Sequence, residues 1–377
     1  MPVVAAVGPV CLSVDRFRSG QDRAPRPKRP FHAAPATGIR HDDENEGAAA
    51  RINRWPRSCR GTGSRCPHPG PGEVRVAVKA ASVNHRELFI AHGQYPGMTV
   101  PSVMGCDGAG VVDMLGEGVT GASVGDEVII YPARQWGPRR DTPAPDFGLL
   151  GMPFPGTIAE YICVPAENLA PKPAFMTWEE AGAMPLTALT SWRALMFKGQ
   201  LKPGEKLLIS GIGGGVATFG LAFAVALGCD VWCTGESEEV LENARKMGAK
   251  DGLLFTDPEW RKKVGKMTGG VDVVLDGAPS PSLPNYIRAI NPGGRIVIYG
   301  STAGNEIKFN ATDLFLKSAT LLGSQVGDII DFRDMLTFAD KHKIKPVIER
   351  TFPLAEAREA LLHLRDKHSF GKISVVI

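Results

Sequence analysis

The chain has 377 residues, of which 43% are hydrophobic and 22% are charged, a composition typical of a globular protein with room for two domains. Its net charge of +3 is unevenly distributed, because residues 1–70 hold 12 basic and six acidic residues and the remainder holds 31 basic and 34 acidic ones. This nearly neutral remainder argues against a nucleic-acid-binding surface.

The cysteines and the longest uncharged stretch indicate the environment of the protein. Residues 207–229 contain no charge, but glycines within 211–215 divide the stretch into a strand and a helix, so we expect buried elements rather than a membrane span. Free thiols in a reducing compartment are favoured, because the cysteines are odd in number and lack paired spacing. They are Cys11, Cys59, Cys66, Cys106, Cys163, Cys229 and Cys233. We expect a cytoplasmic protein, with an organellar location left open by its N-terminus.

Residues 1–68 differ from the rest of the chain. They are rich in Arg, Pro, Gly and Ala, contain an acidic run at 42–46, and sustain no period of 2 or 3.6 residues. This composition predicts a disordered extension. The alternative is a wrong reading frame or gene model, so that the authentic protein has a different start.

Several short strands are expected next, beginning with 73–80, where apolar and polar residues alternate. The further predicted strands are 111–115, 126–131 and 159–164. Gly and Pro turns between them favour a barrel-like β domain. The Pro- and Gly-rich residues 132–156 predict a long connection of a kind that is often functional or mobile.

From Trp178 the pattern becomes helical through Phe197, and strands then alternate with helices. The predicted strands are 206–210, 231–234, 252–255, 271–276, 295–299 and 320–323, and the predicted helices are 216–228, 237–247, 258–267, 282–290 and 313–317. Six strands with intervening helices fit a doubly wound parallel α/β sheet. The tail 328–377 is expected to hold a helix, a strand at 346–348, a helix at 354–366 and a final strand at 373–377.

A glycine-rich turn at 211–216 joins the first of these strands to its helix. Such a turn lets the backbone approach a pyrophosphate, and the helix N-terminus offers free N–H groups to it. A flexible loop is the alternative, but the strand–turn–helix context favours dinucleotide binding. The expected phosphate-binding residues are those of the turn, Gly211, Gly214, Gly215 and Val216.

From about Pro69 onward the chain resembles the medium-chain dehydrogenase/reductase superfamily. The resemblance is carried by the glycine turn and by the stretches 69–74, 105–110, 124–128, 156–161 and 370–373. It implies a GroES-like catalytic domain formed by residues 69–188 and 327–377, with a Rossmann domain at 189–326. Within the superfamily the chain looks like the zinc-free quinone oxidoreductase branch.

That assignment depends on the zinc positions of alcohol dehydrogenases, which correspond to Asn84, Cys106 and Leu186 here. Leucine cannot bind a metal and asparagine is a poor zinc ligand. The lobe corresponding to the structural zinc site, 131–154, contains no cysteine. We therefore expect no metal.

Without a metal, the resemblance implies hydride transfer from a nicotinamide to a quinone or an α,β-unsaturated carbonyl, whose conjugated oxygen spreads the developing charge. The resemblance implies Asn84, Asp107 and Thr190 as catalytic residues, with Thr187 also near the cleft. The cofactor-binding residues expected in addition to the turn are Asn84, Thr190, Gly235, Ser237 and Gly300. His85 is a candidate proton donor, and a solvent-facing or stacking histidine is the alternative. The alternatives are a zinc-free alcohol or aldehyde oxidoreductase and a catalytically silent cofactor-binding protein.

We expect NADPH, with NADH possible, because the position at which NAD enzymes usually carry an acid is Gly235. Ser237 can donate to a 2′-phosphate, whereas Glu236 would repel one if it faced inward. Val240 and Phe255 stand where relatives carry Lys and Tyr. We also expect a homodimer that acts on a small-molecule substrate, without nucleic-acid or membrane partners.

Overall fold

The fold is taken from a computed structural model, which describes residues 66–95, 98, 102–366 and 370–377. The prediction for residues 1–68 therefore lies almost wholly outside the described residues. Among the described residues, no helix is long and apolar enough to cross a bilayer.

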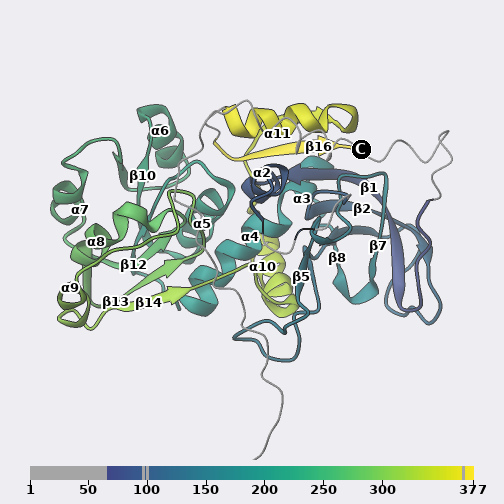
Figure 1. The fold of residues 1–377 in the computed structure, drawn as a ribbon, viewed down its shortest axis with the longest axis horizontal. Helices are drawn as coiled ribbons and strands as arrows, with labels where there is room; N and C mark the ends of the chain where they lie inside the picture. The colour runs from purple at the N-terminus through teal and green to yellow at the C-terminus, as the bar shows by residue number, and fades with distance from the viewer. Residues whose placement is uncertain (1–65, 96–97, 99–101, 367–369) are drawn as a thin grey trace, which may run out of the picture. The chain divides into compact units, whose positions relative to one another are not determined.

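The first part of the described chain and its last two strands form a mostly antiparallel sheet (Figure 1). Its strand order is β15-β16-β1-β2-β3-β8, and β7 pairs with β1. The alternation predicted for the first strand is confirmed, because successive side chains of β1 between Glu73 and Val78 are alternately half-buried and buried. The strands are β1 (Glu73–Val83), β2 (Asp107–Leu115), β3 (Glu127–Ile130), β7 (Tyr161–Pro165), β8 (Leu169–Pro171), β15 (Ile348–Pro353) and β16 (Lys372–Val376).

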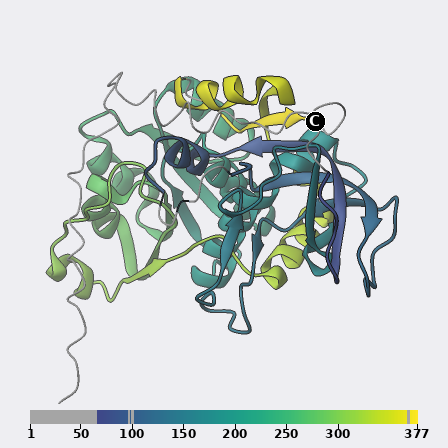
Figure 2. The same cartoon turned by 45° about the vertical axis from the view of Figure 1, so that its right-hand side comes forward.

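The last strand of the chain returns to the first. Strand β16 runs antiparallel to β1, with Val83 opposite Ile373 and Ser82 opposite Ser374 (Figure 2). On its other side β16 pairs in parallel with β15. This pairing brings the start of β16 next to the end of β1, although almost 290 residues separate them.

The second sheet is parallel throughout and has the order β11-β10-β9-β12-β13-β14, so β9 and β12 meet where the order reverses. Ligands of such sheets bind at the carboxyl ends of the strands around this reversal. The strands are β9 (Lys206–Ile209), β10 (Asp230–Gly235), β11 (Asp251–Leu254), β12 (Val271–Asp276), β13 (Ile290–Ile298) and β14 (Thr320–Gly323). The helices between them are α5 (Gly215–Leu227), α6 (Glu238–Lys246), α7 (Trp260–Thr268), α8 (Pro279–Ala289) and α9 (Ala311–Phe315). The predicted α/β class and both sheet types are confirmed.

The helical stretch predicted at 178–197 is not one helix. It divides at Met184-Pro185, because proline has no N–H to donate and favours the first turn of a new helix. The segments are α3 (Trp178–Ala183), α4 (Pro185–Trp192) and a π-helical turn η3 (Arg193–Lys198).

Other features differ from the sequence-based prediction. The strand predicted at 346–348 begins only at Ile348, as β15 (Ile348–Pro353). Residues 132–156 are not a plain connection, because they contain the small sheet β4 (Ala133–Arg134), β5 (Gly148–Leu150) and β6 (Pro153–Phe154). Strands of two or three residues leave no readable alternation. Helix α2 (His85–Ala91) was not predicted, since its seven residues give less than two turns of pattern.

The C-terminal region completes the fold. The helix predicted at 354–366 begins as a 3₁₀ turn, η4 (Leu354–Glu356), and continues as α11 (Ala357–Asp366). Helix α10 (Ile329–His342) precedes β15. Earlier in the chain, a 3₁₀ turn, η2 (Ala166–Asn168), precedes β8. Side chains of α4, α5 and α10 share one apolar core that includes Leu189, Phe219 and Phe332. The domain boundaries predicted at 188/189 and 326/327 stay a prediction.

Candidate functional site

The predicted phosphate cradle lies between β9 and α5. Gly213 has φ +135°, a conformation that side chains rarely adopt, and the backbone N–H of Ile212 donates to the carbonyl of Thr234 on β10 (2.7 Å). Gly214 is the N-cap of α5 and has no side chain that could cap the helix. The backbone N–H groups of the first turn therefore receive no side-chain hydrogen bond from the N-cap residue. The space where Cβ atoms of Gly211 and Gly214 would stand is open. The turn is therefore shaped to accept an anionic group.

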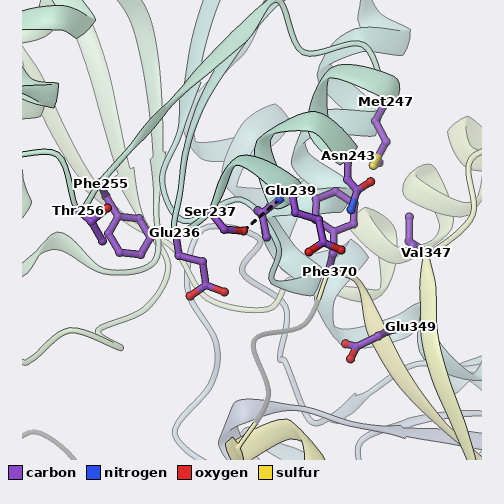
Figure 3. Close-up of a pocket in the computed structure, with 11 residues that line it drawn as sticks. Glu236, Ser237, Glu239, Asn243, Met247, Phe255, Thr256, Val347, Glu349 and Phe370 are labelled. Carbon is purple, nitrogen blue, oxygen red and sulfur yellow. Dashed lines mark hydrogen bonds between the residues drawn. The ribbon is translucent and has the colours of Figure 1, made fainter.

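A pocket of about 940 Å³ begins at the end of β10, one strand away from the turn (Figure 3). Ser237 is the N-cap of α6, and its Oγ accepts a hydrogen bond from the backbone N–H of Val240 (3.3 Å). The pocket is lined by Glu236, Ser237, Glu239, Val240, Asn243, Met247, Phe255, Thr256, Val347, Glu349 and Phe370. Gly235 lies just before this set.

Two predicted catalytic residues, Asn84 and Asp107, meet in a buried polar cluster. The Asn84 amide donates to Asp107 Oδ2 (2.8 Å), and Ser82 Oγ donates to the same oxygen (2.6 Å). The backbone N–H of Leu186 donates to Asp107 Oδ1 (2.5 Å). Asp107 is fully buried and Asn84 is 7% exposed. Such a carboxylate needs a compensating charge.

Lys372 supplies this charge, and the sequence-based reasoning did not assign it a role. Its Nζ lies 3.1 Å from Asp107 Oδ2, and it also donates to the side-chain oxygen of Asn84 and to the carbonyl of Val83 (3.3 Å). The lysine is buried, at 4% exposed. A lysine at the start of a mostly apolar terminal strand is the signal that could have identified it.

The lysine also joins the cluster to the glycine turn. A Cβ added to Gly215 would stand 2.7 Å from Lys372 Cδ and 3.1 Å from the Thr187 hydroxyl. The backbone N–H of Gly371 donates to the Gly213 carbonyl (2.7 Å). The polar cluster and the turn therefore form one continuous site.

Two threonines on α4 differ in how their hydroxyl groups are used. Thr190, the predicted catalytic residue, donates its Oγ1 hydrogen bond to the Leu186 carbonyl (2.7 Å) within the helix. The buried Thr187 hydroxyl has no hydrogen-bond partner and lies against Gly215. Thr187 is thus the hydroxyl with unused hydrogen-bonding capacity next to the turn.

Helix α2 carries an acidic residue, Glu87, in its first turn. Glu87 is fully buried, pairs with Arg86 (2.9 Å) and accepts from the backbone N–H of Asn84 (2.8 Å). Burial raises the pKa of Glu87 against the opposing charge of Arg86. Glu87 therefore caps the helix and fixes the backbone of Asn84.

The exposure and the lowered pKa of His85 argue against the role of proton donor considered above. The residue is exposed. Protein atoms around the ring partly desolvate it, and this desolvation, followed by the charge of Lys372, lowers the pKa of His85. Its imidazole is accordingly neutral at neutral pH.

Gly300 follows β13. A Cβ there would stand 3.1 Å from the backbone oxygen of Gly277, which follows β12. This close approach of two loops explains why position 300 is a glycine. Contact of Gly300 with a cofactor stays a prediction.

Comparisons with known proteins identify the family of the chain. Residues 70–174 match the alcohol dehydrogenase GroES-like domain, and residues 215–341 match the zinc-binding dehydrogenase domain. A "zinc-type alcohol dehydrogenase-like protein YogA" of Leptosphaeria maculans is 37% identical over 82% of this chain and 92% of its own length. The chain belongs to the medium-chain dehydrogenase/reductase superfamily.

Two further relatives of this superfamily bear on the site. A solved structure, "NAD-dependent alcohol dehydrogenase", aligns with a TM-score of 0.78 and 35% identity over 84% of this chain and 95% of its own. A "crotonyl-CoA reductase" of Streptomyces collinus is 28% identical over 82% of this chain and 79% of its own length. Relatives in this superfamily are oxidoreductases that use NAD or NADP.

The family name of the second domain implies zinc, but the residues of the site do not fit a zinc ion. Leu186 has no ligating side-chain atom, and the Asn84 oxygen accepts from the Lys372 ammonium instead. Burial, with a further contribution from Glu87, raises the pKa of the Cys106 thiol well above its usual range. Within 66–95, 98, 102–366 and 370–377, no group of three or more His, Cys, Asp or Glu residues has the geometry of a metal site.

We predict that Cys106 resists alkylation in the folded protein at pH 8. Because its pKa is raised, the thiol stays protonated there and thiolate appears only at higher pH, and the side chain is also fully buried. The measurement is peptide mapping after treatment with iodoacetamide, with half-buried Cys66 as the comparison. Labelling of Cys106 at the rate found in denatured protein would contradict the prediction.

Proposed function

We propose that the protein is an NAD(P)H-dependent oxidoreductase that transfers hydride, without zinc, to a quinone or an α,β-unsaturated carbonyl. The observation that carries the proposal is the Lys372–Asn84–Asp107 cluster beside the glycine turn. The Lys372 ammonium donates to the Asn84 oxygen and Leu186 offers no ligand, so the position that corresponds to the zinc site lacks the ligands for a metal. The acceptor must then be one that stabilises its own developing charge, as a conjugated carbonyl does.

The dinucleotide fits the described residues. The N–H groups at the start of α5 and the turn around Gly213 would hold the pyrophosphate, and the pocket beyond β10 would hold the adenosine. When bound, the nicotinamide supplies the hydride. We propose Asn84, Thr187 and Thr190 as the residues beside it.

The cluster positions these groups. Asp107 and Lys372 hold the Asn84 amide from both ends, so its orientation is fixed before substrate binds. The Thr187 hydroxyl can donate to an acceptor oxygen, since no protein group uses its proton. This donor is neutral and weaker than a metal, which again suits a conjugated acceptor better than a simple ketone.

The relatives support two substrate classes. The name crotonyl-CoA reductase describes reduction of a conjugated thioester, which agrees with the proposal. The names of the 37% and 35% identical relatives describe alcohol dehydrogenases, and these favour a zinc-free alcohol or aldehyde oxidoreductase as the second candidate. A cytoplasmic homodimer is proposed for either.

Matched acceptors separate the candidates. Purified protein is assayed with NADH and NADPH against cyclohexenone, a naphthoquinone and cyclohexanone, and with NAD⁺ and NADP⁺ against cyclohexanol. The proposal predicts turnover of the enone or quinone and none of the saturated pair. Oxidation of cyclohexanol without enone reduction would establish the second candidate, and cofactor binding without any turnover would establish a silent binding protein.

A further inference from the structure

At the base of the glycine turn lies a second buried carboxyl group, that of Asp276, the last residue of β12. Its Oδ1 accepts a hydrogen bond from Ser210 Oγ (2.5 Å) and another from the backbone N–H of Ala278 (2.9 Å). Ser210 directly precedes Gly211, the first glycine of the turn, and its Oγ also accepts from the backbone N–H of Gly277 (3.2 Å). Asp276 therefore ties the end of β12 to the base of the turn.

The start of the turn is also held from β10, on the other side of β9. The backbone N–H of Gly211 donates to Thr234 Oγ1 (3.1 Å). Tyr286 of α8 is buried, and its hydroxyl interacts with the side chains of Thr234 and Ser210. Together with Asp276, these side chains form a buried polar cluster at the point where the strand order reverses, which is where sheets of this kind bind their ligands.

The carboxyl group of Asp276 lacks the compensation that Asp107 receives from a lysine. Asp276 is fully buried, and among the described residues its Oδ2 has no hydrogen-bond partner. Burial raises the pKa of this carboxyl, against the hydrogen bonds from Ser210 and Ala278. No basic side chain in the described part of the chain stabilises its charge. An ionised Asp276 would therefore be an uncompensated buried charge.

The other members of the cluster are neutral. Strands β9 and β10 are followed or ended by the hydroxyl-bearing Ser210 and Thr234, and α8 contributes Tyr286. Tyr299, which follows β13, donates its backbone N–H to the Asp276 carbonyl (3.0 Å). Burial raises the pKa of both tyrosines, so neither is charged at neutral pH. Ionisation of Asp276 would thus place a negative charge next to a turn that is shaped to accept an anion.

We propose that Asp276 positions the glycine turn for the dinucleotide as an uncharged acid, so that binding takes up a proton wherever the free protein holds this residue ionised. The inference rests on the proposed function, since the anion it assumes is the pyrophosphate of a dinucleotide. The proton comes from solvent and adds to Oδ2, the oxygen without a partner, while Oδ1 keeps both of its hydrogen bonds.

The direction of the pH dependence follows from the sign of the charges. The negative pyrophosphate raises the pKa of Asp276 further in the complex than in the free protein. Affinity should therefore increase as the pH falls from the pKa of the complex to that of the free protein, and it should be constant outside this interval. Because linkage is reciprocal, protonation strengthens binding by the same factor by which binding favours protonation.

Calorimetric titration measures this coupling without turnover. NAD⁺ and NADP⁺, which are stable in acid, are titrated into the full-length protein between about pH 5 and pH 9. Titrations in two buffers of different ionisation enthalpy give the number of protons taken up. For the wild-type protein we expect uptake of up to one proton and about tenfold tighter binding at the acidic end of the range. Circular dichroism at each pH verifies that the protein stays folded.

Three variants locate the effect. Asp276→Asn has the shape of the neutral acid and keeps an acceptor for Ser210 and Ala278, so it should bind as tightly as the wild-type protein does in acid, with the proton uptake lost. Ser210→Ala cuts the link to the turn and should weaken binding several-fold at every pH. Asp272→Asn is the matched control, because Asp272 is a half-buried carboxylate near the other end of β12, and it should retain the wild-type pH dependence.

The outcomes separate the inference from the function on which it rests. A wild-type affinity that does not change with pH, or equal proton uptake by the wild-type protein and Asp276→Asn, overturns the inference and leaves the oxidoreductase proposal intact. Loss of the pH dependence in Asp272→Asn overturns the assignment to Asp276, and unchanged binding by Ser210→Ala overturns the positioning role. If neither dinucleotide binds the wild-type protein at any pH, the proposed function and the inference fail together.

Discussion

Replacement of Lys372 by methionine is expected to destabilise the protein by about 3–5 kcal/mol and to abolish reductase activity. The substitution keeps most of the side-chain volume but removes the ammonium group. The fully buried Asp107 carboxyl would then have only neutral hydrogen-bond donors around it. The Asn84 amide would also lose the partner that fixes its oxygen.

Chemical denaturation gives the change in the free energy of unfolding, and kcat is compared at a temperature at which both proteins are folded. Lys79→Met is the matched control, because Lys79 is an exposed lysine on β1 of the same sheet. The double variant Lys372→Met/Asp107→Asn should recover part of the stability but none of the activity. Unchanged stability in Lys372→Met would show that the ammonium does not compensate Asp107.

Replacement of Asp331 by asparagine is expected to cost a similar amount, about 3–5 kcal/mol, through Arg193. Arg193 is 1% exposed, pairs with Asp331, and lies over the rings of Trp136 (4.6 Å) and Phe197 (4.4 Å). Arg140 contacts the same carboxylate (2.8 Å). The network therefore fastens the segment 132–156 to α10 and to the π-helical turn.

The expected loss of stability arises because Arg193 would be left without its carboxylate partner. It does not arise from a large net contribution of the Arg193–Asp331 ion pair to the free energy of unfolding. Burial raises the pKa of Asp331 despite its arginine partners, which agrees with the small net contribution of buried ion pairs. Arg193 would nevertheless stay charged and buried without its partner. Asp334→Asn, an exposed change on the same helix, is the control for denaturation measurements. Equal stabilities of the two variants would contradict this account of Arg193.

The sequence predicted most of the parallel sheet, because each strand is an apolar run between turn signals. Strands β12 and β14 fall at the predicted residues, and the other four differ only at their ends. The small sheet in 132–156 and helix α2 escaped prediction, since neither is long enough to sustain a period. Tertiary packing, not propensity, holds such short elements.

Individual residues of the site could be predicted from their local sequence motifs. The contacts that connect them in the folded protein could not. Asn84 and Asp107 were identified as candidates, but their link through Lys372 depends on β16 pairing with β1. Gly235 was identified by its position at the end of β10, but the packing of Leu241 against it is visible only in three dimensions, and the choice of cofactor stays a prediction. The first case concerns residues almost 290 positions apart, and the second depends on how α6 packs against β10.

Metal dependence tests the central claim most directly. Purified active protein is analysed for zinc by mass spectrometry, and its NAD(P)H-dependent reduction of cyclohexenone or a naphthoquinone is measured with and without a strong chelator. The account predicts far less than one zinc per chain and the same rate in both assays, since Lys372 occupies the oxygens of Asn84 and Asp107. Stoichiometric zinc, with activity lost on chelation and restored by added zinc, would contradict it.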